Sequence, residues 1–299
     1  MSPRFTVIIP TYDHGETLYY SVRSVVEQQM PDFELFIIGD GATPETGRVA
    51  RELAALDRRI TFIEYPKHHR RGEPYRHEIL TKRARGAFVC YLCDDDLWLP
   101  NHLEYMEQLL QKADFAHPVA SFVDAYGQVQ VRPFTLQEPF YREMMLQGEN
   151  RIGLSSMAHT LDFYKRLPHG WRTTPPGQLT DLYMYQQLLS YPGVVAASGK
   201  KLTLLNFPDG LRMHLSREQK LAELKLWFSK IHDSGFEREL NERLFTAAYQ
   251  KAIDLERTLT PKLLDVIWQR DQEIKSAHAY KNHAESLERA IKRTPVQST

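Results

Sequence analysis

The sequence predicts an α/β fold in which a mostly parallel sheet is flanked by helices and followed by a helical C-terminal region. Short apolar runs alternate with amphipathic helical patterns in the first half of the chain, which is typical of βαβ units. From Ser216 onward the helical pattern is almost continuous. We therefore expect an α/β domain over residues 1–215 and a helical extension over residues 216–299.

The four N-terminal strands are predicted from β-branched and apolar residues at positions 5–9, 35–38, 61–64 and 87–92. The fourth run is apolar throughout, as expected for a strand that is buried on both faces. A first helix is expected near residues 16–28, because Leu18, Val22 and Val25 form one apolar stripe. The second helix begins at Thr43, a capping residue that is followed by proline.

The remaining elements of the domain follow from the same patterns. A third helix near residues 78–85 ends at Gly86. Leu103 to Leu110 predict an amphipathic helix. Strands are then expected at residues 115–123 and 129–134, a helix at 182–189 and a strand at 201–205. The loop at residues 168–176 is rich in Gly, Pro and Thr, and loops of this kind often contain functional residues.

The helical extension opens with a capping box, in which Ser216 and Gln219 satisfy backbone donors. Pro261 is expected to start another helix. Apolar residues then recur near heptad spacing over residues 263–291, although charged residues at Arg270, Lys281 and Glu288 interrupt the seam. The pattern allows a homo-oligomer through a coiled coil and, equally, a surface helix that folds back on the domain.

Composition excludes some classes of protein. The 38 basic and 38 acidic residues cancel, which argues against a nucleic-acid partner bound by bulk charge. The two cysteines, Cys90 and Cys93, have no second pair to complete a zinc site and are expected in the core. We find no signal peptide and no stretch apolar enough to span a bilayer. The expected location is cytoplasmic, and peripheral contact with the inner face of the membrane through the basic tail stays open.

Three consecutive carboxylates, Asp94, Asp95 and Asp96, follow the fourth strand. Open α/β sheets bind ligands at the carboxyl ends of their strands. Because three adjacent carboxylates repel one another, we expect a hard divalent cation there, Mg²⁺ or Mn²⁺, holding phosphate oxygens. The alternative is an acidic turn that caps the next helix.

Three segments together resemble the family-2 glycosyltransferases, which have the Rossmann-like GT-A fold. The first strand ends in Pro-Thr-Tyr, the second ends in Asp40-Gly41-Ala42-Thr43, and the acidic triplet precedes Leu97-Trp98-Leu99-Pro100. Ala42 replaces the family's usual serine, and Gly39 replaces the first of a common aspartate pair. The resemblance covers about the first two-thirds of the chain, and the three motifs occur in the family's order at strand ends.

The resemblance implies a site for a nucleoside-diphosphate sugar, with UDP favoured. Asp40 would accept a hydrogen bond from the base, and one carboxylate of the triplet would bind the ribose. Arg71 or Arg76 would contact base or phosphate, unless they are surface arginines. The residues expected to bind the nucleotide are Pro10, Thr11, Tyr12, Asp40, Arg71, Asp94 and Asp95. Asp96 matches the family's metal-binding aspartate, and His214 is a candidate further ligand, with a surface histidine as the alternative.

The same resemblance places the catalytic base at Asp181, since Thr180-Asp181 matches the family's Glu-Asp element at a helix start. The helix dipole there stabilises the carboxylate and should lower its pKa. One base and one direct displacement would invert the anomeric centre. Trp171 is expected to stack on an acceptor sugar, and the competing interpretation is a core residue.

The expected function is an inverting, metal-dependent glycosyltransferase acting on a glycan or lipid-linked acceptor in bacterial surface polysaccharide synthesis. A sugar nucleotidyltransferase is a second hypothesis, but residues 11–15 lack the Gly-rich basic loop that such enzymes usually have. A third hypothesis is a catalytically inactive relative that acts as a binding or scaffold subunit. The intact aspartates argue against it.

Overall fold

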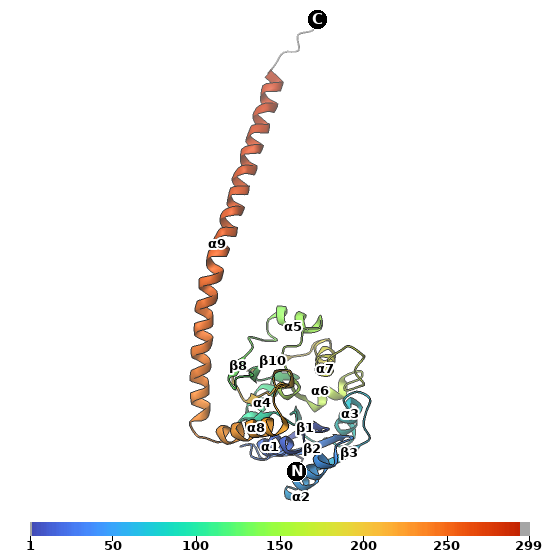
Figure 1. The fold of residues 1–299 in the computed structure, drawn as a ribbon. Coiled ribbons are helices and arrows are strands. Elements are labelled where there is room, and N and C mark those ends of the chain that lie inside the picture. Colours follow the sequence, from blue (N-terminus) through green and yellow to red (C-terminus); the bar gives the residue numbers. More distant parts are fainter. Residues whose placement is uncertain (1, 294–299) are drawn as a thin grey trace. The chain divides into compact units, whose positions relative to one another are not determined.

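The computed structural model describes residues 2–293. It forms two compact units, the first ending at Asn241 and the second beginning at Glu242 (Figure 1). Helix α9 (Phe236–Arg293) runs through this boundary. Helix α8 (Arg217–Ile231) belongs to the first unit, although the sequence places it in the helical extension. The boundary between residues 215 and 216 stays a prediction.

A seven-stranded sheet forms the centre of the first unit, with the order β10-β6-β9-β4-β1-β2-β3. All neighbours pair in parallel except β9, which is antiparallel to β4 and to β6. The mostly parallel sheet is therefore confirmed. In spatial order its strands are β10 (Ala196–Ser198), β6 (Phe115–His117), β9 (Ala158–Thr160), β4 (Phe88–Tyr91), β1 (Phe5–Thr11), β2 (Phe33–Asp40) and β3 (Ile60–Tyr65).

Helices cover both faces of the sheet, because successive side chains of the strands point to opposite sides. Val7 and Ile9 of β1 pack in one apolar core with α1 (Gly15–Val26), α2 (Pro44–Leu56) and α4 (His102–Leu110). Ile8 packs in a second core with the opposite layer, which consists of α3 (Glu73–Lys82), α6 (Leu161–Arg166) and α7 (Thr180–Leu189). This arrangement is the expected three-layer α/β fold (Figure 1).

Short elements extend the carboxyl edge of the sheet. They are β5 (Leu97–Trp98) paired with β11 (Leu204–Leu205), the hairpin β7 (Ser121–Val123) and β8 (Val129–Val131), α5 (Pro139–Leu146) and the 3-10 helices η1 (Leu154–Ser156) and η2 (Asp209–Leu211). The strand expected over residues 115–123 divides into β6 and β7. Pro118 explains the break, because proline has no N–H for a strand ladder.

The capping box at Ser216 is confirmed, since its hydroxyl accepts from Gln219 N and the Gln219 side chain accepts from Ser216 N. The helix start expected at Pro261 is wrong, because Pro261 lies inside the continuous helix α9. An internal proline costs about 3 kcal/mol of helix stability. Apolar side chains of α9 such as Leu259, Leu263 and Trp268 are exposed. Within the described residues, no helix is both long and apolar enough to cross a membrane.

Candidate active site

The parallel register brings three strand ends to one edge of the sheet. Thr11 of β1 pairs with Gly39 of β2, and Ile8 pairs with Tyr91 of β4. The residues that follow each strand therefore converge, as expected for an open α/β sheet. Two adjoining cavities open at this edge, and we name them by the elements that build them.

The strand-end cavity has a volume of about 660 Å³. It is lined by most of the residues predicted to bind the nucleotide, namely Pro10, Thr11, Tyr12, Asp40, Arg71 and Asp94. Asp181 lines the same cavity, together with Lys67, Arg70 and Arg76. The structure thus brings together residues from β1, β2, β4 and α7 that are widely separated in the sequence.

The loop cavity has a volume of about 450 Å³ and is lined by the whole acidic triplet and by Asp181. Its other walls come from residues 120–122, Arg132, residues 150–154 and residues 206–209. The two cavities share His14, Arg71, Cys93, Asp94, Leu154, Asp181 and Asp209. Of the two cysteines expected in the core, Cys90 is buried there, and Cys93 packs against the core while also lining both cavities.

Asp40 is held by the basic segment that follows β3. Its Oδ2 accepts from Lys67 Nζ at 2.6 Å, and its Oδ1 accepts from the His68 backbone N–H at 2.6 Å. The Lys67 ammonium also lies 4.4 Å from the centroid of the Tyr12 ring, which is 44% exposed. Gly41 has φ +65°, and a Cβ there would lie 2.5 Å from Lys67 Cβ. Only glycine lets the two segments approach this closely.

The three aspartates of the triplet have different surroundings. Asp96 is 4% exposed, and its carboxylate accepts from Phe207 N at 2.7 Å and from the Ser155 hydroxyl. Burial raises the pKa of Asp96 to about 6. Asp94 accepts a hydrogen bond from His14 at 2.8 Å, while its other oxygen is buried without a partner. Burial and the two adjacent charges raise the pKa of Asp95 well above its ordinary value.

His14, which caps α1, is a site residue that the sequence analysis missed. Its hydrogen bond to Asp94 raises its pKa to about 10, so the imidazole is charged at neutral pH. Eighty positions separate the two residues, and no motif joins them. The available signal is topological, because both follow the carboxyl ends of neighbouring strands, β1 and β4.

The donor atoms at the triplet fit a hard divalent cation. Asp95 belongs to two groups of possible ligands, and within each group the ligating atoms lie within 4.8 Å of one another. One group contains Asp95 with His14 and Asp209, and the other contains Asp95 with Cys93 and Asp96. Burial raises the pKa of the Cys93 thiol well above its usual value, so the available ligands are carboxylate oxygens and, only after it loses its proton, the His14 imidazole. Mg²⁺ and Mn²⁺ accept such ligands.

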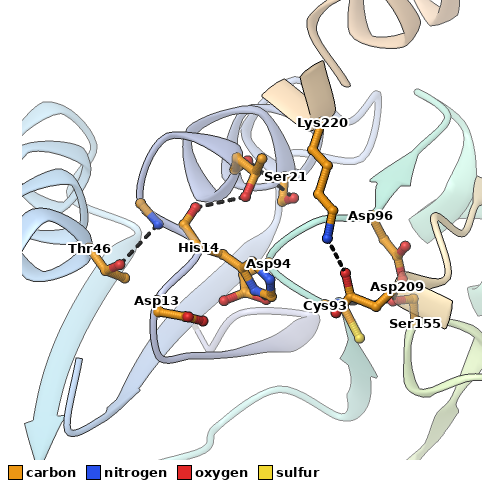
Figure 2. Close-up of polar contacts among 12 residues, drawn as sticks. Asp13, His14, Ser21, Thr46, Cys93, Asp94, Asp96, Ser155, Asp209 and Lys220 are labelled. Atoms are coloured by element: carbon orange, nitrogen blue, oxygen red, sulfur yellow. Dashed lines mark hydrogen bonds and ion pairs between the residues drawn. The ribbon is translucent and has the colours of Figure 1, made fainter. Parts of the chain in front are cut away.

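His214, the ligand suggested by the sequence, is exposed and belongs to neither of these groups. The histidine that reaches the triplet is His14. Asp209 was also missed, and it comes from the short helix η2, where Lys220 donates to it at 2.8 Å (Figure 2).

Asp181 occupies the first turn of α7 and lines both cavities. Burial raises its pKa, even though the charges of Arg76 and Arg71 act in the opposite direction. The lowered pKa expected from the helix dipole is therefore wrong, because desolvation of the carboxylate outweighs the dipole. A raised pKa makes Asp181 a stronger base than an exposed aspartate.

Glu73 connects the segments that surround Asp181. Its fully buried carboxylate accepts three hydrogen bonds, from Arg71 N at 3.2 Å, from Thr174 N at 3.3 Å and from the Thr180 hydroxyl at 3.4 Å. It thereby joins the basic segment of the strand-end cavity to the loop that ends at Asp181. No sequence pattern singles Glu73 out, since a glutamate beside a proline is an ordinary helix start.

Trp171 lies in the core. Its ring is 2% exposed, and its Nε1–H donates to the Tyr91 hydroxyl at 2.9 Å. The buried guanidinium of Arg76 lies 5.0 Å from the ring centroid. The ring face is therefore out of reach of an acceptor sugar, and the core interpretation of Trp171 applies.

Comparison with known proteins identifies the family. Residues 6–167, more than half of the chain, match the family described as glycosyl transferase family 2. The chain is 27% identical over 107 residues to the Escherichia coli UDP-Glc:alpha-D-GlcNAc-diphosphoundecaprenol beta-1,3-glucosyltransferase WfgD, covering 36% of this chain and 41% of WfgD. It is 29% identical over 117 residues to the Campylobacter jejuni GalNAc(5)-diNAcBac-PP-undecaprenol beta-1,3-glucosyltransferase, covering 38% of this chain and 37% of that protein. The chain thus spans well under half the length of these two relatives.

Solved structures agree with the fold. Staphylococcus aureus TarS 1–349 in complex with UDP-GlcNAc superposes with a TM-score of 0.53 at 17% identity, covering 69% of this chain and 58% of TarS. The Pyrobaculum calidifontis mannosyltransferase PcManGT in complex with GDP-Man and Mn²⁺ superposes with a TM-score of 0.51 at 16% identity, covering 87% and 84% of the two chains. The predicted GT-A fold is confirmed, and the chain belongs to glycosyl transferase family 2.

Proposed function

We propose that this protein transfers a sugar from a nucleoside-diphosphate sugar to a hydroxyl of a glycan or lipid-linked acceptor, with inversion at the anomeric carbon. One observation supports the proposal most strongly: Asp181 and the acidic triplet line the same cavity, next to the residues at the ends of β1 and β2. A base, a site for the leaving diphosphate and a nucleotide pocket are the three elements that such a transfer needs.

The nucleotide would occupy the strand-end cavity. Tyr12 offers an exposed ring face beside the base, and Asp40 offers a carboxylate for the base N–H. Lys67, Arg70 and Arg71 supply positive charge for the diphosphate from the same wall. UDP is the favoured nucleotide, since two relatives are a UDP-glucose transferase and a protein crystallised with UDP-GlcNAc.

A divalent cation would be held by the acidic triplet with Asp209 as a further ligand, and when bound it would stabilise the negative charge of the leaving diphosphate. His14 would become a ligand only on losing its proton, because an imidazolium has no lone pair for a metal. PcManGT, crystallised with Mn²⁺, is a precedent for such a cation in this fold. The carboxylate of Asp96 would at the same time keep the loops at Ser155 and Phe207 in place, through the hydrogen bonds that it accepts from both.

Asp181 would remove the proton from the acceptor hydroxyl. The acceptor oxygen then forms a bond to the anomeric carbon as the bond from that carbon to the diphosphate oxygen breaks. The proton ends on the Asp181 carboxylate, and the electron pair leaves with the nucleoside diphosphate. Because attack and departure lie on opposite sides of the anomeric carbon, the configuration inverts.

The deciding experiment is turnover of a panel of UDP- and GDP-sugars, with and without Mn²⁺, followed by release of nucleoside diphosphate. We expect release of UDP that depends on the cation and on Asp181. Release of pyrophosphate from a sugar phosphate and UTP would instead indicate a nucleotidyltransferase. Binding of UDP without turnover in the presence of any acceptor would indicate a scaffold subunit.

The exposed apolar residues of α9 support a second, separate proposal, that the chain self-associates through this helix. The location proposed for the chain is the cytoplasm, with peripheral contact at the inner face of the membrane. Deleting the residues after Thr260 is expected to lower the molar mass in light scattering and leave UDP affinity unchanged. An unchanged mass per particle would contradict self-association through this segment. Flotation of the full chain with vesicles tests the membrane contact.

A further inference from the structure

We propose that the loop cavity contains an acceptor subsite for an oxyanion, a phosphoryl or carboxylate group, bound between Arg132 and Arg151. The inference rests on the proposed function, because it treats the loop cavity as the acceptor half of the site. Arg132 directly follows the hairpin β7–β8, and Arg151 lies between α5 and η1. Both line the same cavity as Asp181.

Arg151 has an unused donor. Its Nε is buried and has no hydrogen-bond partner, and within the described part of the chain the one hydrogen bond of its guanidinium is from Nη2 to Met144 Sδ at 3.9 Å. A guanidinium stays charged at every physiological pH and has five N–H donors. A buried charged donor without an acceptor is unfavourable, and a ligand oxyanion would remove that penalty.

Arg132 is exposed, and its side chain packs on an aromatic ring. Its backbone N–H donates to Ala120 O at 2.9 Å, and its guanidinium carbon lies 4.9 Å from the centroid of the Phe122 ring, which also lines the cavity. Stacking on an aromatic ring leaves the N–H edges of a guanidinium available for a planar or tetrahedral oxyanion.

Neither arginine is neutralised by the protein. Among the side chains that the structure describes, no carboxylate forms an ion pair with Arg132 or Arg151, whereas Arg212, beside the same site, pairs with Glu223 at 2.8 Å. The same cavity is lined by five aspartates, of which Asp94 accepts a hydrogen bond from His14 and Asp96 accepts from the Ser155 hydroxyl and Phe207 N. The cation proposed at the triplet would offset part of their negative charge. If the acceptor were neutral, the guanidinium groups of Arg132 and Arg151 would have no bound anion as a partner.

The position of the pair favours the acceptor over the donor. Arg132 and Arg151 line only the loop cavity, while the strand-end cavity has its own basic residues at Lys67 and Arg70. The side chains of Asn150 and Asn206 lie in the loop cavity as well, and their amides suit sugar hydroxyls. The substrate class that this wall would recognise is a sugar bearing a negative charge near the hydroxyl that is glycosylated.

Calorimetry on the full chain, with UDP and Mn²⁺ at saturation, tests the subsite with three probes: glucose 1-phosphate, glucuronic acid and methyl glucoside. Saturation keeps the probes out of the donor pocket. At least one anionic probe is expected to bind more tightly than the neutral one, by about tenfold or more. Preference for the phosphate identifies a phosphorylated acceptor, and preference for the uronate identifies an acidic sugar.

Arg132→Ala and Arg151→Ala should each weaken binding of the preferred probe by about tenfold. The affinity of Arg151→Lys for this probe should lie between those of the wild type and Arg151→Ala, and UDP affinity should be unchanged in all three variants. Arg58→Ala, on an exposed arginine outside both cavities, is the matched control and should bind every probe like the wild type. Equal affinity for charged and neutral probes, or retained anion binding in both alanine variants, would overturn the subsite. If UDP itself does not bind, the proposed function fails, and the same titration without nucleotide still decides the subsite.

Discussion

The two cavities of the site meet at Asp94 and Asp181 but are built differently. The strand-end cavity consists of residues that follow adjacent strands, so the register of the sheet fixes their positions. The loop cavity consists of a hairpin, two short 3-10 helices and the turns between them. The family match at residues 6–167 contains every predicted nucleotide-binding residue and ends before Asp181 and Asp209. We infer that the sheet determines the donor half and the loops determine the acceptor half.

Both halves contain buried polar groups without a protein partner. In the strand-end cavity both oxygens of Asp40 accept hydrogen bonds from the protein, but Thr11 Oγ1, Arg70 Nε and Arg76 Nε have no partner. Arg151 Nε has none at the loop cavity, and neither has one oxygen of Asp94, which lines both cavities. Such groups are the ones that a ligand or a cation is expected to satisfy. Because the two halves would bind different substrates, substitutions in each half should affect different measurements.

The largest effect is expected from Asp96→Ala, which removes a carboxylate from the cation site. Transfer should fall by on the order of ten-thousand-fold, and the gain in UDP affinity on adding Mn²⁺ should disappear. Kinetics and calorimetry check both. Ser155→Ala is the matched control, because it removes the hydroxyl that Asp96 accepts from and leaves the carboxylate in place. Full activity of Asp96→Ala in EDTA would contradict the cation site.

Asp181→Asn should lower the transfer rate by about a hundred- to ten-thousand-fold and leave UDP affinity unchanged. The amide keeps the size of the side chain but cannot take the proton. Because burial raises the pKa of Asp181, the wild-type rate should fall as the pH drops through that raised pKa, above the ordinary range of an aspartate. The variant should lack this acidic limb. A near wild-type rate, or a loss of UDP binding as severe as in Asp96→Ala, would place the base elsewhere.

Glu73→Ala should affect both halves, because Glu73 joins the segment at Arg71 to the loop that ends at Thr180. Misplacement of Asp181 by a fraction of an ångström should lower kcat by about ten- to a hundredfold. Glu73→Gln retains an acceptor oxygen and should restore part of the rate. Glu78→Gln, on the same helix, is the control. A lower melting temperature with unchanged kcat would assign Glu73 a purely structural role.

The same division explains what the sequence could predict. Pro10, Asp40 and Asp94 were identifiable because a strand end is visible in the sequence and parallel strands bring their ends together. His14 and Arg151 were not, because their surroundings depend on how distant loops fold. Trp171 suggested a ligand contact because it is an aromatic residue in a Gly/Pro-rich loop. Its indole N–H instead donates a hydrogen bond to the Tyr91 hydroxyl within the core.

The smallest effect is expected from Asp40→Ala, which tests whether the strand-end cavity distinguishes uracil from other nucleobases. If Asp40 accepts a hydrogen bond from the base, the variant should lose about tenfold in UDP affinity while its affinity for GDP barely changes. Asp40 also holds Lys67 and His68, so its removal could act by releasing the basic segment instead. Release of that segment would weaken UDP and GDP equally, because both carry the diphosphate. Lys67→Ala, which removes one hydrogen bond to Asp40 and a positive charge, should show this equal loss. Unchanged UDP affinity in Asp40→Ala would remove Asp40 from the nucleotide site and leave it the role of holding the segment in place.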